Sequence, residues 1–280
     1  MIASIRAREY AKNILPPFVV RRISRALNNG DSGFAPPFAD VRRLPGMQRG
    51  TTELFGKEFE FVDGPGFLFL HDEIVAKEIY KFATDSPTPY IIDGGANIGL
   101  SLLYFKRLYP NARIVAFEPD PDIFETLQKN CRTFAFEGVE LSDRALWTEN
   151  GFLDFRKEGS LGGRLADDGS VGDVRVPTRR LRDLLTSTVD LLKLDIEGSE
   201  TEVLEDCANL LVNVKNLFVE YHSFADRPQS LHRLLAVTYD AGFRTHVHVY
   251  DPSPQPLFDR RIRTGMDRID MNLDLFCYRA

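Results

Sequence analysis

The sequence predicts an α/β fold with a doubly wound, mostly parallel seven-stranded sheet. From Tyr90 onwards, short apolar runs alternate with amphipathic segments of helical period. A glycine-rich loop follows the first of these runs and opens a helix, as ligand-binding loops of such sheets do. Val189–Leu194 is almost wholly apolar, which is typical of a central strand that is buried on both faces.

The first part of the chain has a different character. Residues 1–49 contain nine Lys/Arg and three Asp/Glu, about +6, so the remainder carries about −12 of the net charge of −6. We predict a basic helical arm and linker over residues 1–50, with a small β extension and the main domain over 51–280. The arm could contact an anionic membrane surface or a second copy in a homodimer, but we favour a solvated arm that packs over the core.

Composition excludes several classes of function. The net charge is mildly acidic, which argues against nucleic acid as the main partner. No apolar run is long enough to span a bilayer, and the first 15 residues do not resemble a secretory signal. The three cysteines are widely separated and suggest neither a disulfide framework nor a zinc site. A cytoplasmic setting is therefore expected.

The individual elements follow from periodicity and from turn residues. Alternating residues around Gly56 predict a hairpin of Thr51–Phe55 and Lys57–Val62, and apolar spacing predicts a helix over Asp72–Phe82. The sheet strands are expected at Tyr90–Asp93, Arg113–Phe117, Val139–Ser142, Val189–Leu194, Asn216–Tyr221, Phe243–Tyr250 and Leu273–Tyr278. Helices are expected from the glycine loop to Leu108, after Asp120, at Glu200–Leu211 and at Gln229–Asp240, with an inserted hairpin at Gly151–Arg156 and Asp173–Pro177.

The glycine loop is the first candidate binding element. Its glycines allow the backbone to approach a ligand closely, and the helix that it opens favours an anionic group such as a carboxylate. The acid that leads the loop could contact a ligand ammonium group. The loop residues expected to bind a ligand are Asp93, Gly94, Gly95, Ala96, Asn97 and Gly99.

Glu118 ends the second predicted strand, 19 residues after Gly99. A carboxylate at this position can accept hydrogen bonds from both hydroxyls of a ribose. Its simpler role would be a charge at the entry to the next helix. An NAD(P)-dependent oxidoreductase shares these features, but the spacing Gly94-Gly95-x-x-x-Gly99 matches the G-x-G-x-x-G dinucleotide loop poorly.

The segment Asp195-Ile196-Glu197-Gly198-Ser199-Glu200, followed by Val203-Leu204, resembles the FkbM family of methyltransferases, as do the glycine loop and Phe117-Glu118-Pro119. The resemblance implies a class I methyltransferase (Rossmann-like) fold whose last strand is antiparallel. It also implies transfer of a methyl group from S-adenosylmethionine to a hydroxyl, often of a sugar, glycolipid or secondary metabolite. The glycine loop, Glu118 and Pro119 would bind this cofactor, with Ser142, Asp143 and Ala145 near its adenine.

The chemistry is expected at the ends of the fourth and fifth strands. A hydroxyl acceptor must lose a proton, and the candidates to assist are Asp195, Glu197, Glu220 and His222. Either Asp195 or His222 acts as a general base, or Asp195, Glu197 and Glu220 bind Mg²⁺; we favour the metal-free route. A non-catalytic scaffold of the same fold remains the alternative to an enzyme.

Overall fold

A computed structural model describes residues 38, 40–44, 46, 48–157, 163–165, 172–225, 227–249 and 269–279. Most of the predicted basic arm lies outside these residues, so its separation as a domain, its membrane contact and its part in a homodimer stay predictions. Within the described part of the chain, no helix is long and apolar enough to cross a membrane.

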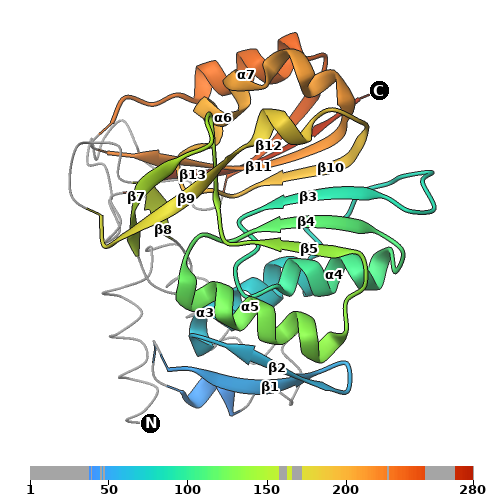
Figure 1. Ribbon diagram of the computed structural model, residues 1–280, viewed down its shortest axis with the longest axis vertical. Helices are drawn as coiled ribbons and strands as arrows, with labels where there is room; N and C mark the ends of the chain where they lie inside the picture. Colours follow the sequence, from blue (N-terminus) through green and yellow to red (C-terminus); the bar gives the residue numbers. More distant parts are fainter. Residues whose placement is uncertain are drawn as a thin grey trace.

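A seven-stranded sheet forms the centre of the molecule (Figure 1). Its strand order is β5-β4-β3-β10-β11-β13-β12, and β13 alone runs antiparallel to its two neighbours. The winding direction reverses between β3 and β10, which confirms the predicted doubly wound fold and its antiparallel last strand. The strands are β3 (Tyr90–Gly94), β4 (Arg113–Phe117), β5 (Val139–Ser142), β10 (Val189–Leu194), β11 (Val214–Phe224), β12 (Arg244–Val249) and β13 (Ile269–Tyr278).

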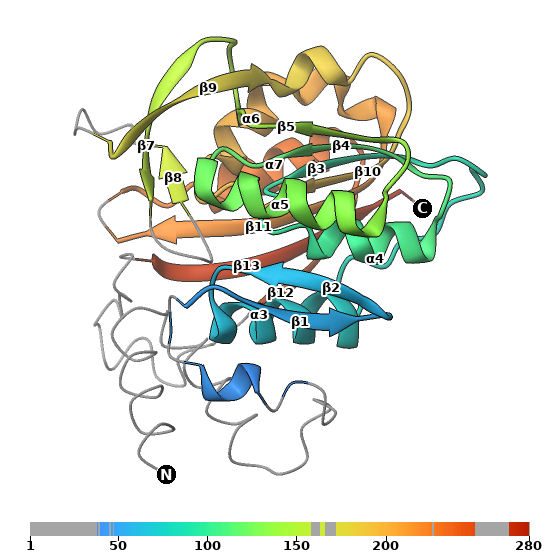
Figure 2. The same ribbon diagram turned by 60° about the horizontal axis from the view of Figure 1, so that its bottom comes forward.

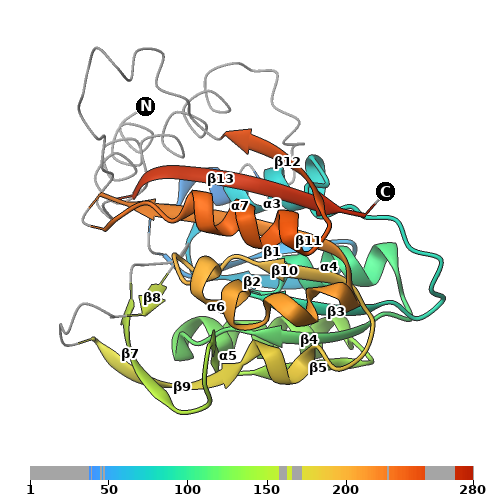
Figure 3. The same cartoon turned by 90° about the horizontal axis from the view of Figure 1, so that it is seen from above.

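Helices cover both faces of this sheet, and each face has its own apolar core (Figures 1 and 3). One face carries α3 (Gly64–His71), α4 (Leu100–Leu108) and α5 (Pro121–Phe134). The other face carries α6 (Glu200–Asp206) and α7 (Leu231–Asp240). The predicted hairpin is present as β1 (Gly50–Leu54) and β2 (Lys57–Phe61), and it packs beside α3 and α5 (Figure 2).

Helix α5 begins where the sequence predicts. The Asp120 side chain accepts hydrogen bonds from the backbone amides of Asp122 and Ile123, at 2.8 and 3.3 Å, and Pro121 occupies the first helical position. This cap fixes the turn between β4 and α5, and the turn holds Glu118.

Several predicted boundaries were wrong: the helix expected at Glu200–Leu211 ends at Asp206, the last strand begins at Ile269 and not at Leu273, and two further differences follow. The helix expected over Asp72–Phe82 instead begins at Gly64, because the Asp63 carboxylate caps the amide of Gly66 at 2.7 Å, and after a π-helical turn it ends at Ala76. Strand β11 continues past the expected end at Tyr221 to Phe224, because β13 pairs with it along this whole length. His222 therefore belongs to the strand itself.

A second, four-stranded sheet is inserted between β5 and β10. It consists of β6 (Ala145–Trp147), β7 (Phe152–Lys157), β8 (Gly163–Leu165) and β9 (Val174–Arg180). Antiparallel pairing of β7 with β9 confirms the predicted inserted hairpin. The insertion lies beyond the carboxyl ends of the central strands (Figure 1), where parallel sheets of this type bind ligands.

Candidate active site

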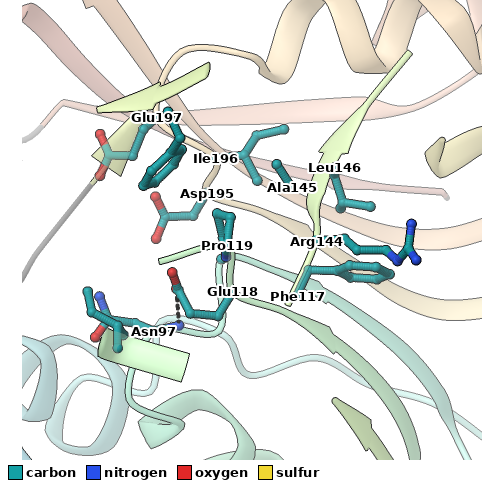
Figure 4. Close-up of a pocket in the computed structure, with 13 residues that line it drawn as sticks. Asn97, Phe117, Glu118, Pro119, Arg144, Ala145, Leu146, Asp195, Ile196 and Glu197 are labelled. Carbon is teal, nitrogen blue, oxygen red and sulfur yellow. Dashed lines mark hydrogen bonds between the residues drawn. The ribbon is translucent and has the colours of Figure 1, made fainter. Parts of the chain in front are cut away.

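A pocket opens at the carboxyl ends of β3, β4 and β10, on both sides of the point where the winding reverses (Figure 4). It brings together predicted residues from three separate motifs: the glycine loop, the end of β4 and the loop after β10. The described residues that line it are Gly95, Asn97, Phe117, Glu118, Pro119, Ile123, Arg144, Ala145, Leu146, Phe155, Asp195, Ile196 and Glu197.

The glycine loop lies in tight contact with neighbouring backbone. The amides of Gly95 and Ala96 donate hydrogen bonds to the carbonyl of Phe117, at 3.0 and 2.8 Å. Gly95 has a φ of +86°, and a Cβ atom there would lie 1.9 Å from the carbonyl oxygen of Asp195. Gly99 has a φ of +89°. Both glycines thus adopt a backbone conformation that other residues rarely take.

Glu118 is buried at the floor of the pocket, with 6% of its surface exposed. Its two carboxylate oxygens accept hydrogen bonds from the amides of Asn97 and Asp120, at 3.0 and 2.9 Å (Figure 4). Burial raises the pKa of Glu118 to about 8, although these two amides and Lys193 act to lower it. The carboxylate therefore links the glycine loop to the start of α5 while remaining at the pocket wall.

Asp93 lies behind the pocket. Its carboxylate is fully buried, accepts a hydrogen bond from the Ser101 hydroxyl at 2.6 Å and forms an ion pair with Lys193 at 3.1 Å. The side chain thus already faces a cation from the protein itself. Among the predicted loop residues, Gly95 and Asn97 line the pocket, whereas Asp93, Gly94, Ala96 and Gly99 support the loop from outside the lining.

The three residues expected near the adenine differ in their relation to the pocket, and their contact with an adenine stays a prediction. Ala145 lines the pocket, but Ser142 and Asp143 are not among its described lining residues, and Asp143 is exposed. Ser142 contributes through its carbonyl, which accepts the amide of Glu118 at 3.0 Å. The sequence did not identify Arg144, Leu146 and Phe155 as lining residues. Phe155 reaches the pocket only because the inserted sheet folds over it.

Asp195 projects into the pocket from the end of β10 (Figure 4). Its side chain is 23% exposed and lies 3.7 Å from the Lys193 ammonium. Burial and the nearby charge of Glu220 raise the pKa of Asp195 to about 7, while Lys193 and His222 act to lower it. A carboxylate with this pKa can exchange a proton near neutral pH.

His222 is surrounded by three carboxylates. Its ring nitrogens lie 3.5 Å from Glu197, 3.3 Å from Glu200 and 3.6 Å from Glu220. Burial alone would lower the pKa of His222, but these carboxylates raise it well above its ordinary value. The imidazole is therefore protonated near neutral pH, and this geometry favours Asp195 over His222 as a general base.

Glu200 holds the loop after β10 from the first turn of α6. Its carboxylate accepts hydrogen bonds from the amides of Ile196 and Gly198, at 3.1 and 3.0 Å. Glu197 and Gly198 have φ values of +55° and +93°. This backbone turns the Glu197 side chain toward the pocket, where burial raises its pKa well above the ordinary value.

The residues that could hold a metal differ from the predicted set. Asp195, Glu220 and His222 each offer a ligand atom within 4.8 Å of the others, whereas the sequence predicts Asp195, Glu197 and Glu220. Glu220 is also fixed by Asn272, whose side-chain amide donates to it at 2.8 Å. A nitrogen ligand suits Mg²⁺ poorly, because this ion prefers oxygen.

The site thus combines a glycine loop, a buried acid at the end of β4 and a carboxylate cluster at the point where a doubly wound sheet reverses its winding, which is where sheets of this class bind ligands. A family model described as "Methyltransferase FkbM domain" matches residues 93–245. This chain belongs to the FkbM methyltransferase family and is a methyltransferase.

Three curated relatives agree with this assignment. Methyltransferase sdnD of Sordaria araneosa is 33% identical, over 62% of this chain and 81% of its own length. Methyltransferase 1 of Beauveria bassiana (strain ARSEF 2860) is 32% identical over 49% of this chain, which spans just under two thirds (65%) of that relative. The 2-O-methyltransferase NoeI of Sinorhizobium fredii (strain NBRC 101917 / NGR234) is 29% identical, over 58% of this chain and 74% of its own length.

Proposed function

We propose that this protein is an S-adenosylmethionine-dependent O-methyltransferase, and that Asp195 is its general base. The observation that carries the proposal is the position of Glu118 and Asp195 in the lining of one pocket (Figure 4). Glu118 supports binding of a ribose, and Asp195 supports removal of a hydroxyl proton. Membership of a methyltransferase family leaves the NAD(P) oxidoreductase and the non-catalytic scaffold without support.

The cofactor would supply a methyl group that is already activated by its sulfonium charge. The protein must then orient the acceptor oxygen and remove its proton. Glu118 would accept hydrogen bonds from the ribose hydroxyls, with Asn97 and Pro119 beside it in the pocket wall. Asp195 would accept the acceptor's hydroxyl proton, and its pKa of about 7 suits transfer near neutral pH.

His222 would position the carboxylates around the reaction centre. As an imidazolium it holds Glu197, Glu200 and Glu220 by ion pairs of 3.3–3.6 Å. The negative charge that these carboxylates place around His222 would attract the positive sulfonium of the cofactor. Burial alone would raise the pKa of Glu220, but hydrogen bonds from His222 and Asn272 lower it, so Glu220 would act by electrostatic stabilisation and Asp195 by proton transfer. Glu197, whose pKa is raised, would act by holding the His222 ring.

We propose an uncharged hydroxyl of a sugar, glycan, glycolipid or secondary metabolite as the acceptor. NoeI, a relative named as a 2-O-methyltransferase, supports transfer to oxygen. A transfer screen with radiolabelled methyl groups should test sugar nucleotides, oligosaccharides and cell extracts in parallel. Label incorporated into none of these, together with no binding of S-adenosylmethionine, would refute the proposed function.

Replacing Glu118 with Gln should weaken S-adenosylmethionine binding by roughly a hundredfold, because the amide has no charge and only one acceptor oxygen for the two ribose hydroxyls. In the wild type, the Kd should rise as the pH falls below about 8, because only the ionised carboxylate accepts both hydroxyls and burial raises its pKa to about 8. Calorimetry between pH 6 and 9 measures both effects. The exposed Glu140 on the adjacent strand is the control, and Glu140→Gln should bind as the wild type does.

Chelation separates the two mechanisms. In the metal-free mechanism, incubation with excess EDTA followed by desalting should leave the rate of methyl transfer unchanged. A loss of activity that added Mg²⁺ restores would instead assign a metal to Asp195 and its neighbours. The wild-type enzyme treated in the same way without EDTA is the control for losses during desalting.

A further inference from the structure

Lys193 is a buried cation at the junction of the glycine loop and the Asp195 strand. Its side chain is 2% exposed, and its ammonium donates hydrogen bonds to the carbonyls of Gly94 and Gly95, at 3.3 and 2.6 Å. It also forms ion pairs with Asp93 at 3.1 Å and with Asp195 at 3.7 Å. One side chain therefore contacts the cofactor loop and the proposed base at the same time.

Several observations explain why a charge is stable at this position. Lys193 and Asp93 are paired residues on adjacent parallel strands, so their side chains lie on the same face of the sheet. The ammonium also lies 5.4 Å from the centre of the Tyr80 ring, which gives a cation–π contact. Burial alone would lower the pKa of Lys193, but Asp93 and Asp195 outweigh it and raise the pKa, so the ammonium remains charged.

The Lys193–Asp93 ion pair differs from an ordinary buried ion pair in its position beside the pocket. A buried charge costs free energy, and apolar residues of similar volume often stabilise a fold as well or better. The amide of Asp195 also donates a hydrogen bond to the carbonyl of Gly94, at 3.0 Å. This carbonyl therefore accepts hydrogen bonds from both the Asp195 amide and the Lys193 ammonium. The contacts of Lys193 are concentrated on the backbone atoms that bring the loop beside Asp195.

We propose that Lys193 is a positioning residue that holds the glycine loop and Asp195 in the arrangement that binds S-adenosylmethionine. This inference rests on the proposed function and extends it. Asp93 then acts through Lys193: its carboxylate fixes the ammonium, and the ammonium fixes the carbonyls of Gly94 and Gly95. An effect of Asp93 on cofactor affinity would not require direct contact with the cofactor.

The test compares Asp93→Asn with the double variant Asp93→Asn/Lys193→Met. The single variant neutralises the buried carboxylate and keeps the loop contacts, and the double variant removes the ammonium without leaving an unpaired buried carboxylate at Asp93. The Kd values for S-adenosylmethionine and S-adenosylhomocysteine are measured by calorimetry at 20 °C. We expect both to rise tenfold or more from the single to the double variant, because both ligands use the same loop.

A second Lys–Asp ion pair, near the amino end of the central strand β10, provides the control. Lys215 on β11 contacts Asp190 on β10 at 2.9 Å, and Asp190 is buried. Asp190→Asn and Asp190→Asn/Lys215→Met should both lower the melting temperature. For each ligand, the Kd values of these two variants should differ by no more than twofold. A merely structural role for Lys193 predicts this same behaviour for its own pair of variants.

Each outcome decides the inference. Equal Kd values in the folded Asp93→Asn and Asp93→Asn/Lys193→Met variants would overturn it, as would a loss confined to the sulfonium ligand, which would indicate charge rather than loop position. If the Met variant does not give the native circular dichroism spectrum, Lys193→Gln in the same background takes its place. A wild-type protein that binds neither ligand would refute the proposed function itself, which is a separate result.

Discussion

Asp195→Asn is expected to lower kcat by roughly 10²–10⁴-fold while the Kd for S-adenosylmethionine stays within about threefold, because a general base is lost without a change of shape. In the wild type, kcat at saturating cofactor should increase with pH through about 7 and then level off. The sign follows from the chemistry: only the ionised carboxylate accepts a proton, and burial raises the pKa of Asp195 to about 7. The rates are measured with the acceptor that the transfer screen identifies.

Asp190 provides the control for this prediction. It lies near the amino end of β10, the strand that Asp195 follows, and its carboxylate accepts hydrogen bonds from Thr84, the Tyr90 amide and Lys215 at 2.7–2.9 Å. Asp190→Asn should reduce stability and leave kcat unchanged. If Asp195→Asn retained more than a tenth of the wild-type kcat, the base would have to be another group.

Much of the fold follows from local sequence signals. The strand at Val189–Leu194 was predicted with its observed bounds, because its apolar residues mark a central strand buried on both faces. The sequence could place the glycine loop together with Glu118 and Asp195, because parallel strands have their carboxyl ends at the same side of the sheet. The glycine loop and the acid at the end of the next strand were therefore predictable as neighbours from the sequence alone.

The remaining features depend on contacts between distant parts of the chain. Asn272 fixes Glu220 from 52 residues away, and this contact exists only because β13 inserts beside β11. The protonation of His222 depends on three carboxylates, which come from the loop after β10, from α6 and from β11, so the sequence left two candidate bases open. The role of Asp93 changed for the same reason: its partner Lys193 lies on a strand 100 residues later in the chain.

Gly95→Ala is expected to have the largest effect on the structure of the site. The added methyl group would lie 1.9 Å from the carbonyl oxygen of Asp195, and a φ of +86° is itself unfavourable for alanine. Neither atom belongs to a side chain that can rotate away, so the loop or the end of β10 must move. We expect a loss of roughly 3 kcal/mol in the free energy of unfolding, seen in calorimetry as a fall of about 6–12 °C in Tm.

Gly56→Ala separates the backbone strain from the clash. Gly56 has a similar φ of +79° in the β1–β2 turn, but nothing lies within 4 Å of its added Cβ. Its variant should lose about 1 kcal/mol from strain alone and bind S-adenosylmethionine as the wild type does. Gly95→Ala should lose binding as well as stability, because the atoms that must move include the glycine loop that is proposed to bind the cofactor. If the two variants were equally stable and both bound the cofactor normally, the close approach of Gly95 to Asp195 would not determine the site.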